Sequence, residues 1–166
     1  MRKMLLAAII FLAIPILACG ADEIKGRITA VDVATGSIDI SGVKVLVQNA
    51  RIENEMDMPI TVADLRTGDY LDVEGSFSGA GQMMAMKIEK DYPEQDEIKG
   101  MIQSVDAAGN SLVIGGITVK IAPGAWLEGH GDMRITVGQF AAGYYVECKG
   151  AWTGQLVFTA NKVEMD

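Results

Sequence analysis

Hydrophobic and polar residues alternate along most of the chain after its first twenty or so positions. In Tyr70–Phe77 apolar residues or glycine occupy every second position, and Tyr145–Trp152 shows the same arrangement. A period of two places successive side chains on opposite faces of a β-strand. Short turn sequences such as Gly79–Gly81 separate the alternating stretches. The pattern predicts an antiparallel all-β protein.

The alternating pattern occurs twice because the sequence is duplicated. Residues Asp22–Gly26 read Asp-Glu-Ile-Lys-Gly, and the same five residues return at Asp96–Gly100. From there the two copies run in parallel to the end, with one residue inserted in the second copy. A long colinear match marks two structural units. The predicted divisions are a signal segment (1–21), a first repeat (22–90), a linker (91–95) and a second repeat (96–166).

Each repeat contains five predicted strands. In the first repeat they cover about 23–32, 37–41, 43–48, 69–77 and 82–90. Between the third and fourth strands, Thr61–Leu65 predicts one helical turn with Thr61 as its N-cap. This is the plan of the OB-fold, a small Greek-key barrel. We expect an all-β fold of two tandem five-stranded OB-like Greek-key barrels, with a generic five-stranded meander as the alternative.

Two irregularities are expected within the strands. Gly26 and Gly100 lie in mid-strand, where glycine often marks a bulge or a sharp bend. In the last strand of the first repeat, Met84 and Met86 have the opposite parity to Ala85. That conflict with the core-facing pattern predicts a second bulge there.

Residues 1–21 have the character of a targeting segment. Arg2 and Lys3 precede an apolar stretch, Met4–Leu17, which is shorter than the ~20 residues needed to span a bilayer. The stretch ends at Ile16-Leu17-Ala18-Cys19, which resembles the lipobox of bacterial lipoproteins and implies a lipid on Cys19. The alternatives are a secretory peptide cleaved after Ala21, leaving a periplasmic protein, and an uncleaved anchor.

The repeated motifs also carry a family resemblance. In the first repeat these motifs are Gly26–Asp32, Ser37–Gly42, Leu65–Gly68 and Ala85–Glu89. Together they resemble a domain of unknown function that is found, often in tandem, in exported bacterial proteins. The second repeat departs from the pattern at Phe140–Tyr144. The resemblance implies an exported OB-like module and no established activity, so it assigns no functional residues.

Composition argues against nucleic-acid binding. The formal net charge is −8 at pH 7, and there is no run of basic residues. Affinity for nucleic acid comes largely from Lys and Arg replacing counterions. An acidic surface of this kind instead keeps a protein soluble.

We find no catalytic signature and expect no enzyme. His130, the single histidine, lies between two glycines, and Asp132 is too close in sequence to orient it as a general base. Cys148 occupies a strand position where the first repeat has Val73, which predicts a small buried hydrophobic residue and not a reactive thiol.

Methionine content suggests an alternative, a Cu(I) site. The chain has ten methionines, and thioether sulfur favours Cu(I). Met56 and Met58 form a Met-x-Met pair that resembles small periplasmic OB-fold copper chaperones. That resemblance implies a His and a Trp over the metal, and the second repeat supplies Trp126, His130 and Met133 in the corresponding loop. The competing interpretation is that the methionines pack loops and fill the core.

Aromatic residues suggest a binding face. The candidates are Tyr70, Tyr144, Tyr145 and Trp152, which could line a groove for a glycan or a peptide. They could equally pack the core and the barrel ends. The sequence therefore favours an exported, non-catalytic binding or scaffolding module of the bacterial cell envelope. It would bind an unknown envelope protein or glycan and no nucleic acid, use no cofactor, and contact the membrane through a lipid anchor. The alternative is a periplasmic Cu(I)-handling protein.

Overall fold

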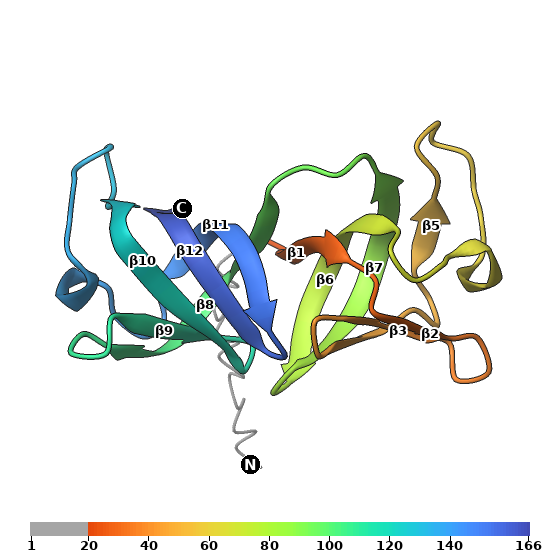
Figure 1. Cartoon of the computed structure of the whole chain (residues 1–166), viewed down its shortest axis with the longest axis horizontal. Helices are drawn as coiled ribbons and strands as arrows, with labels where there is room; N and C mark the ends of the chain where they lie inside the picture. Colours follow the sequence, from red (N-terminus) through yellow and green to blue (C-terminus); the bar gives the residue numbers. More distant parts are fainter. Residues whose placement is uncertain (1–19) are drawn as a thin grey trace, which may run out of the picture.

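The structure is a computed structural model that describes residues 20–166 (Figure 1). Residues 1–19 lie outside the described residues. The predicted signal segment falls there except for Gly20 and Ala21, and so does the predicted lipidation site, Cys19. Both stay predictions.

The described chain is all-β, as the alternation predicted. The first repeat forms β1 (Asp22–Arg27), β2 (Ala30–Asp32), β3 (Ser37–Ile40), β4 (Val43–Leu46), β5 (Arg51–Glu53), β6 (Tyr70–Gly79) and β7 (Gln82–Asp91). The second forms β8 (Asp96–Asp106), β9 (Ser111–Ile114), β10 (Ile117–Glu128), β11 (Tyr145–Gly154) and β12 (Val157–Met165). Two 3-10 turns complete the list, η1 (Val62–Asp64) and η2 (Val137–Gln139).

The helical turn was predicted correctly in the first repeat. Both the backbone N–H and the hydroxyl of Thr61 donate to the carboxylate of Asp64, at 2.8 and 2.7 Å. The side chain of the third residue thus accepts from the N-cap backbone N–H, as in a capping box, and Gln139 does the same for Thr136 in η2. Neither helix in residues 20–166 is long and apolar enough to cross a membrane.

The strands of both repeats have the same order and pairing, but two strands that are continuous in the second repeat are each divided in two in the first. The long strand β8 corresponds to β1 followed by β2, and β10 corresponds to β4 followed by β5. Both β4 and β5 pair in parallel with β7, as β10 pairs in parallel with β12. In the second repeat β11 pairs with both β8 and β12, so the pairings of that repeat close on themselves.

The expectation of two tandem five-stranded OB-like Greek-key barrels is met only in its all-β character. All twelve strands belong to one mixed sheet, because β1 pairs with β8 as well as with β6 (Figure 1). Apolar side chains of both repeats likewise form a single buried cluster that includes Ile24 and Ile98. The open backbone edges of the two pentapeptide copies explain the join, since an unpaired strand edge is a template for another strand.

The glycine prediction needs a second correction. The register slips at Gly75 in β6 and at Gly150 in β11, and not at Gly26 or Gly100. Each slip leaves one residue of the partner strand unpaired, Met86 in β7 in the first repeat, so the bulge predicted for that strand is confirmed. Gly26 has another role, which a contact between the repeats defines.

Candidate functional site

The described chain is organised around the place where the repeats meet, which we call the junction: β1, β8 and the side chains of Phe77 and Trp152. Ile24 lies opposite Ile98, so the two copies of the pentapeptide pair with each other in antiparallel fashion. An acidic residue faces a lysine on either side of this centre, with Glu23 opposite Lys99 and Lys25 opposite Glu97. Opposite charges in facing positions stabilise a strand pair.

Identical segments that pair about their centre make a self-complementary interface, as in a two-fold dimer. The two-fold relation extends to the turns. The backbone N–H of Gly81 donates to the carbonyl of Gly115 at 2.7 Å. In the equivalent position, the N–H of Leu156 donates to the carbonyl of Ser41 at 2.7 Å. Each repeat therefore places the hairpin between its last two strands against a turn of the other.

One aromatic ring from each repeat crosses the junction onto a glycine of the other. The indole Nε1 of Trp152 donates to the Lys25 carbonyl at 3.0 Å, and a Cβ on Gly26 would lie 2.7 Å from that nitrogen. The ring of Phe77 covers Gly115, where a Cβ would lie 2.3 Å from it. Gly26 is thus glycine because the tryptophan of the other repeat occupies the space of a side chain.

The aspartate that begins each pentapeptide binds the strand that carries the aromatic ring of its own repeat, β6 for Phe77 and β11 for Trp152. Asp22 accepts a hydrogen bond from the backbone N–H of Phe77 at 2.9 Å, and Asp96 accepts one from that of Trp152 at 3.1 Å. Burial raises the pKa of both carboxyls, and the backbone hydrogen bonds only partly offset it. Reasoning from sequence alone missed these two residues, although their place in the repeated pentapeptide was a usable signal.

A pH-dependent stability follows from these carboxyls. The folded protein binds a proton on Asp22 and on Asp96 more tightly than the unfolded chain does. Protonation of these carboxyls therefore stabilises the fold below the ordinary aspartate pKa, and this stabilisation is lost as pH rises through the raised folded-state pKa. Asparagine does not ionise, so Asp22→Asn and Asp96→Asn remove the decrease in stability that ionisation of the buried carboxyl causes. We therefore expect each variant to gain stability relative to wild type between about pH 4 and pH 7. Urea unfolding at the two pH values measures this difference.

Asp32→Asn is a control of opposite sign. Hydrogen bonds from Thr35 lower the pKa of Asp32, so its stabilising contribution is present above the ordinary pKa and is lost on acidification. This variant should lose stability relative to wild type between about pH 4 and pH 7. The assignment is contradicted if all three variants show the same trend.

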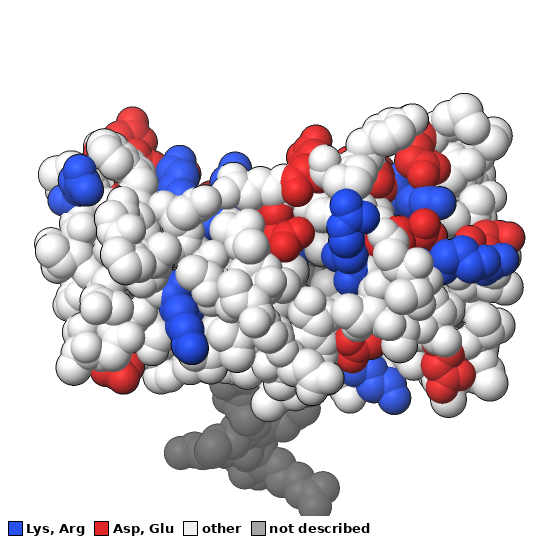
Figure 2. All heavy atoms as spheres, viewed as in Figure 1, with Lys and Arg blue, Asp and Glu red and all other residues white. Residues whose placement is uncertain are grey.

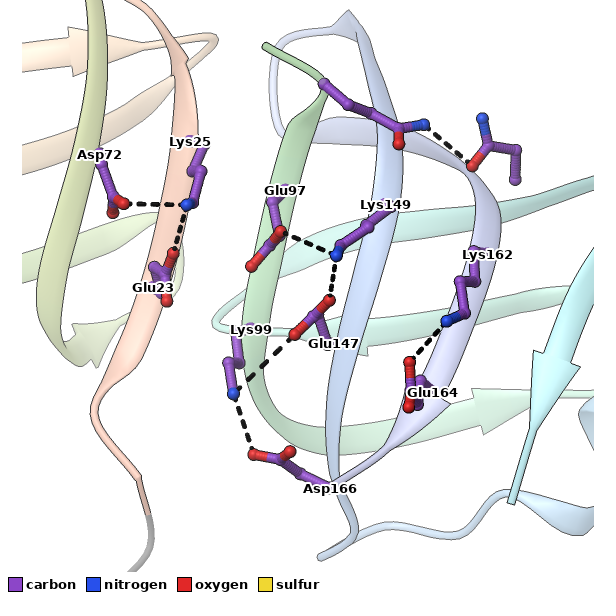
Figure 3. A network of polar contacts seen from close by, with 12 residues as sticks. Glu23, Lys25, Asp72, Glu97, Lys99, Glu147, Lys149, Lys162, Glu164 and Asp166 are labelled. Atoms are coloured by element: carbon purple, nitrogen blue, oxygen red, sulfur yellow. Dashed lines mark hydrogen bonds and ion pairs between the residues drawn. The ribbon is translucent and has the colours of Figure 1, made fainter. Parts of the chain in front are cut away.

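Lysine side chains on the outer face of the junction are paired with acidic residues (Figure 3). Lys25 lies 2.9 Å from Asp72, and Lys149 lies 2.7 Å from Glu147. Lys99 lies 3.0 Å from Asp166. Figure 2 shows basic and acidic side chains interspersed on the face in view, without a broad basic area. Each of these three lysines is therefore neutralised by a carboxylate of the protein itself.

Burial makes Asp72 the most constrained carboxylate of this group. One of its oxygens contacts Lys25, and the other is buried without a hydrogen-bond partner. Burial is the largest influence and raises the pKa of Asp72, although the lysine acts in the opposite direction. The ion pair with Lys25 joins β1 to β6 and supports the strand that forms the junction.

Comparison with known families matches the chain twice, over residues 25–89 and 99–164. The family is described as a domain of unknown function, DUF5666. The chain belongs to this family. Its two DUF5666 copies lie in tandem, which confirms the duplication inferred from the sequence. No curated protein and no solved structure matches the chain. The resemblance to OB-fold copper chaperones finds no support among these comparisons.

The copper candidates of the DUF5666 protein are divided between the loop after β5 and the segment formed by the end of β10 and the loop after it; Trp126 lies in β10 and not in the loop where the sequence placed it. Met56 and Met58 are exposed in the loop after β5, whereas His130 and Met133 are exposed in the loop after β10. Figure 1 places these loops at opposite ends of the molecule. Trp126 is exposed and has the Arg134 guanidinium 4.6 Å from its ring centroid, so that cation already occupies one face. Within residues 20–166, no group of three or more His, Cys, Asp or Glu side chains could hold a metal ion.

The aromatic candidates do not form one strip. Tyr70 is buried and donates its hydroxyl hydrogen to the Gln95 carbonyl at 2.9 Å; burial raises its pKa to about 12. Trp152 lies in the junction, edge-on to Phe158 with ring centroids 5.3 Å apart. Tyr144 is exposed, and its neighbour Tyr145 donates to the carbonyl of Ala21. Tyr145 therefore contacts the beginning of the described chain, and Tyr144 precedes it in the sequence.

His130, considered as a general base, and Cys148, considered as a reactive thiol, lie in different parts of the second repeat. Cys148 is fully buried in β11, and burial raises the pKa of its thiol, so the unreactive neutral form dominates. This confirms its interpretation as a small buried hydrophobic residue. His130 is exposed in its loop.

Proposed function

We propose that this DUF5666 protein is exported, is anchored to a membrane through a lipid on Cys19, and acts as a non-catalytic binding or scaffolding module of the bacterial cell envelope. The junction carries this proposal. Backbone pairing of β1 with β8, together with the reciprocal turn contacts, holds the repeats in a fixed relative orientation. A fixed orientation suits a module that presents a surface to a partner, because less freedom is lost on binding.

The position of Gly20 supports the anchoring step. Gly20 is exposed and follows Cys19 directly in the sequence, and a Cβ placed on it would contact the Tyr145 ring at 3.7 Å. Copper handling receives no comparable support, because Met56 and Met58 belong to a different end of the molecule from His130. We therefore do not carry the copper alternative further.

Lipid labelling tests the anchor. Cells that produce the full chain are fed an alkyne fatty acid, and the protein is separated into membrane and soluble fractions. We expect the label and the protein in the membrane fraction, because each buried CH₂ of an acyl chain contributes about 0.8 kcal/mol. Cys19→Ser should lose the label and enter the soluble fraction, whereas Cys148→Ser should behave like wild type. An unlabelled, soluble wild-type protein contradicts the proposal.

Affinity capture tests the binding role. The lipidated protein is cross-linked in intact cells and recovered from envelope extracts, with Cys19→Ser as the control for location. Recovery of one stoichiometric envelope protein or glycan would support the proposal. A reaction product formed from envelope components by the purified protein would contradict its non-catalytic part.

A further inference from the structure

Exposed apolar side chains gather where the described chain begins. Ala21 lines a groove together with Met86 of β7 and Met101 of β8. Met84 of β7 lies opposite Ser76, which also lines this groove, and Tyr144 precedes Tyr145, which pairs with Met101. We call Met84, Met86, Met101 and Tyr144 the N-terminal apolar surface. Their exposed fractions are 40%, 56%, 47% and 42%. The groove has a volume of about 390 Å³ and is lined by Gly20, Ala21, Asp22, Gly75, Ser76, Met86 and Met101. Two exposed methionines that line one groove, with two further exposed apolar side chains beside them, form the kind of patch that marks an interaction site.

The two-fold relation between the repeats supplies a control for this surface. The equivalent positions on the other side of the junction are all polar. Met84, Met86, Met101, Tyr144 and Ala21 correspond to Thr159, Asn161, Arg27, Asp69 and Gln95. There, Gln95 donates to Asn161 at 3.1 Å and Arg27 donates to the Gly68 carbonyl at 2.9 Å. The fold therefore accepts polar residues at these positions, and the apolar set needs another explanation.

The predicted lipid on Cys19 provides that explanation. Consecutive Cα atoms are about 3.8 Å apart, so acyl chains on Cys19 would enter the bilayer within one residue of Gly20. Gly20 lines the groove, and the Tyr145 hydroxyl holds the Ala21 carbonyl against β11. A membrane that receives the acyl chains must then lie beside Met86 and Met101. The polar surface on the other side of the junction has no such neighbour.

We propose that the N-terminal apolar surface rests on the lipid bilayer and inserts its methionine and tyrosine side chains at the headgroup boundary. This inference depends on the lipid anchor proposed above. Among the described residues that line the groove, Asp22 is the single ionisable one, and one of its oxygens accepts the Phe77 N–H. Contact with the membrane is therefore hydrophobic, and does not depend on attraction of Lys or Arg to anionic lipids. The anchor and the surface together fix the orientation of the protein on the membrane.

Methionine oxidation measures this contact. The lipidated full-length protein is reconstituted into vesicles of phosphatidylethanolamine and phosphatidylglycerol, treated with hydrogen peroxide, and digested for mass spectrometry. We expect sulfoxide formation at Met84, Met86 and Met101 to slow several-fold relative to the Cys19→Ser protein in the same vesicle suspension. Met56 and Met133, exposed in the distant loops, should oxidise at the same rate in both proteins. The protection should persist at high salt.

Met101→Arg is the matched variant, since it installs the residue that the first repeat carries at the equivalent position, Arg27. We expect it to fold, to remain lipidated, and to lose the protection of Met84 and Met86. Equal oxidation of wild type and Cys19→Ser, with wild type still labelled and bound to vesicles, overturns the inference and leaves the anchor intact. Protection that requires added envelope proteins also overturns it. Wild type that neither carries the label nor binds vesicles overturns the anchor itself.

Discussion

Gly75→Ala is expected to lower the free energy of unfolding by about 3 kcal/mol, the upper part of the range for over-packing. A Cβ at Gly75 would lie 2.2 Å from the backbone carbonyl oxygen of Met84. Gly150 repeats the situation, with 2.0 Å to the carbonyl oxygen of Thr159. These oxygens belong to paired strands and cannot rotate away as a side chain would. The ladder between β6 and β7 would have to separate at its bulge.

Thermal unfolding measures this cost. A loss of about 3 kcal/mol corresponds to a decrease in Tm of about 6–12 °C for a chain of this size. Gly79→Ala is the matched control, because Gly79 lies in the same strand and a Cβ there would have no neighbour within 4 Å. Its Tm should stay close to that of wild type. Equal effects of Gly75→Ala and Gly79→Ala would show that the close approach in β6 is not limiting.

Trp152→Ala is expected to lower the free energy of unfolding by about 3 kcal/mol, the lower end for removing a buried aromatic ring, since this ring is only half-buried. The substitution removes the edge contact with Phe158, the hydrogen bond to the Lys25 carbonyl, and the cover over Gly26. The last two contacts join the repeats. Trp152→Phe keeps a ring and loses the hydrogen bond, so we expect a smaller loss of about 1 kcal/mol.

Urea unfolding followed by far-UV circular dichroism separates these variants. Trp126→Ala is the control, because Trp126 is exposed and its recorded ring contact is with Arg134. Losing that contact should cost about 0.5–1 kcal/mol. If Trp152→Ala were no more harmful than Trp126→Ala, the junction would not depend on the tryptophan. Phe77→Ala tests the equivalent ring of the first repeat by the same measurement.

Reasoning from sequence succeeded where a local pattern carries the information. Alternation in Tyr70–Phe77 identified β6, and the Thr61 cap identified η1, because both depend on neighbours in the chain. The parity conflict around Ala85 correctly indicated a bulge in β7. The same reasoning assigned Gly26 to a bulge or a sharp bend. The register shows no bulge there, and the space of a side chain is filled by Trp152, far away in the sequence, and by Ile40.

The candidate sites were harder to predict than the strands. Residue type made Met56 and His130 plausible ligands for copper. They belong to equivalent loops of different repeats, however, and these loops lie at opposite ends of the molecule. Conversely, the sequence pattern marked Met86 only for its parity in the strand, and it did not mark Met101 as a surface residue. A position-by-position comparison of the repeats, which shows Met101 where the first repeat has Arg27, was the signal that could have found that surface.

The sequence by itself determined the all-β character, the duplication, the turn chemistry and the acidic charge of this DUF5666 protein, because periodicity, repetition and capping are local or countable properties. Only the tertiary structure decided that Ile24 faces Ile98 and that twelve strands form one sheet. It also decided that Phe77 and Trp152 each cover a glycine of the other repeat. Each of these depends on which strand edges meet in space. Alternation specifies which face of a strand is buried, but it does not name the strand that pairs with an edge.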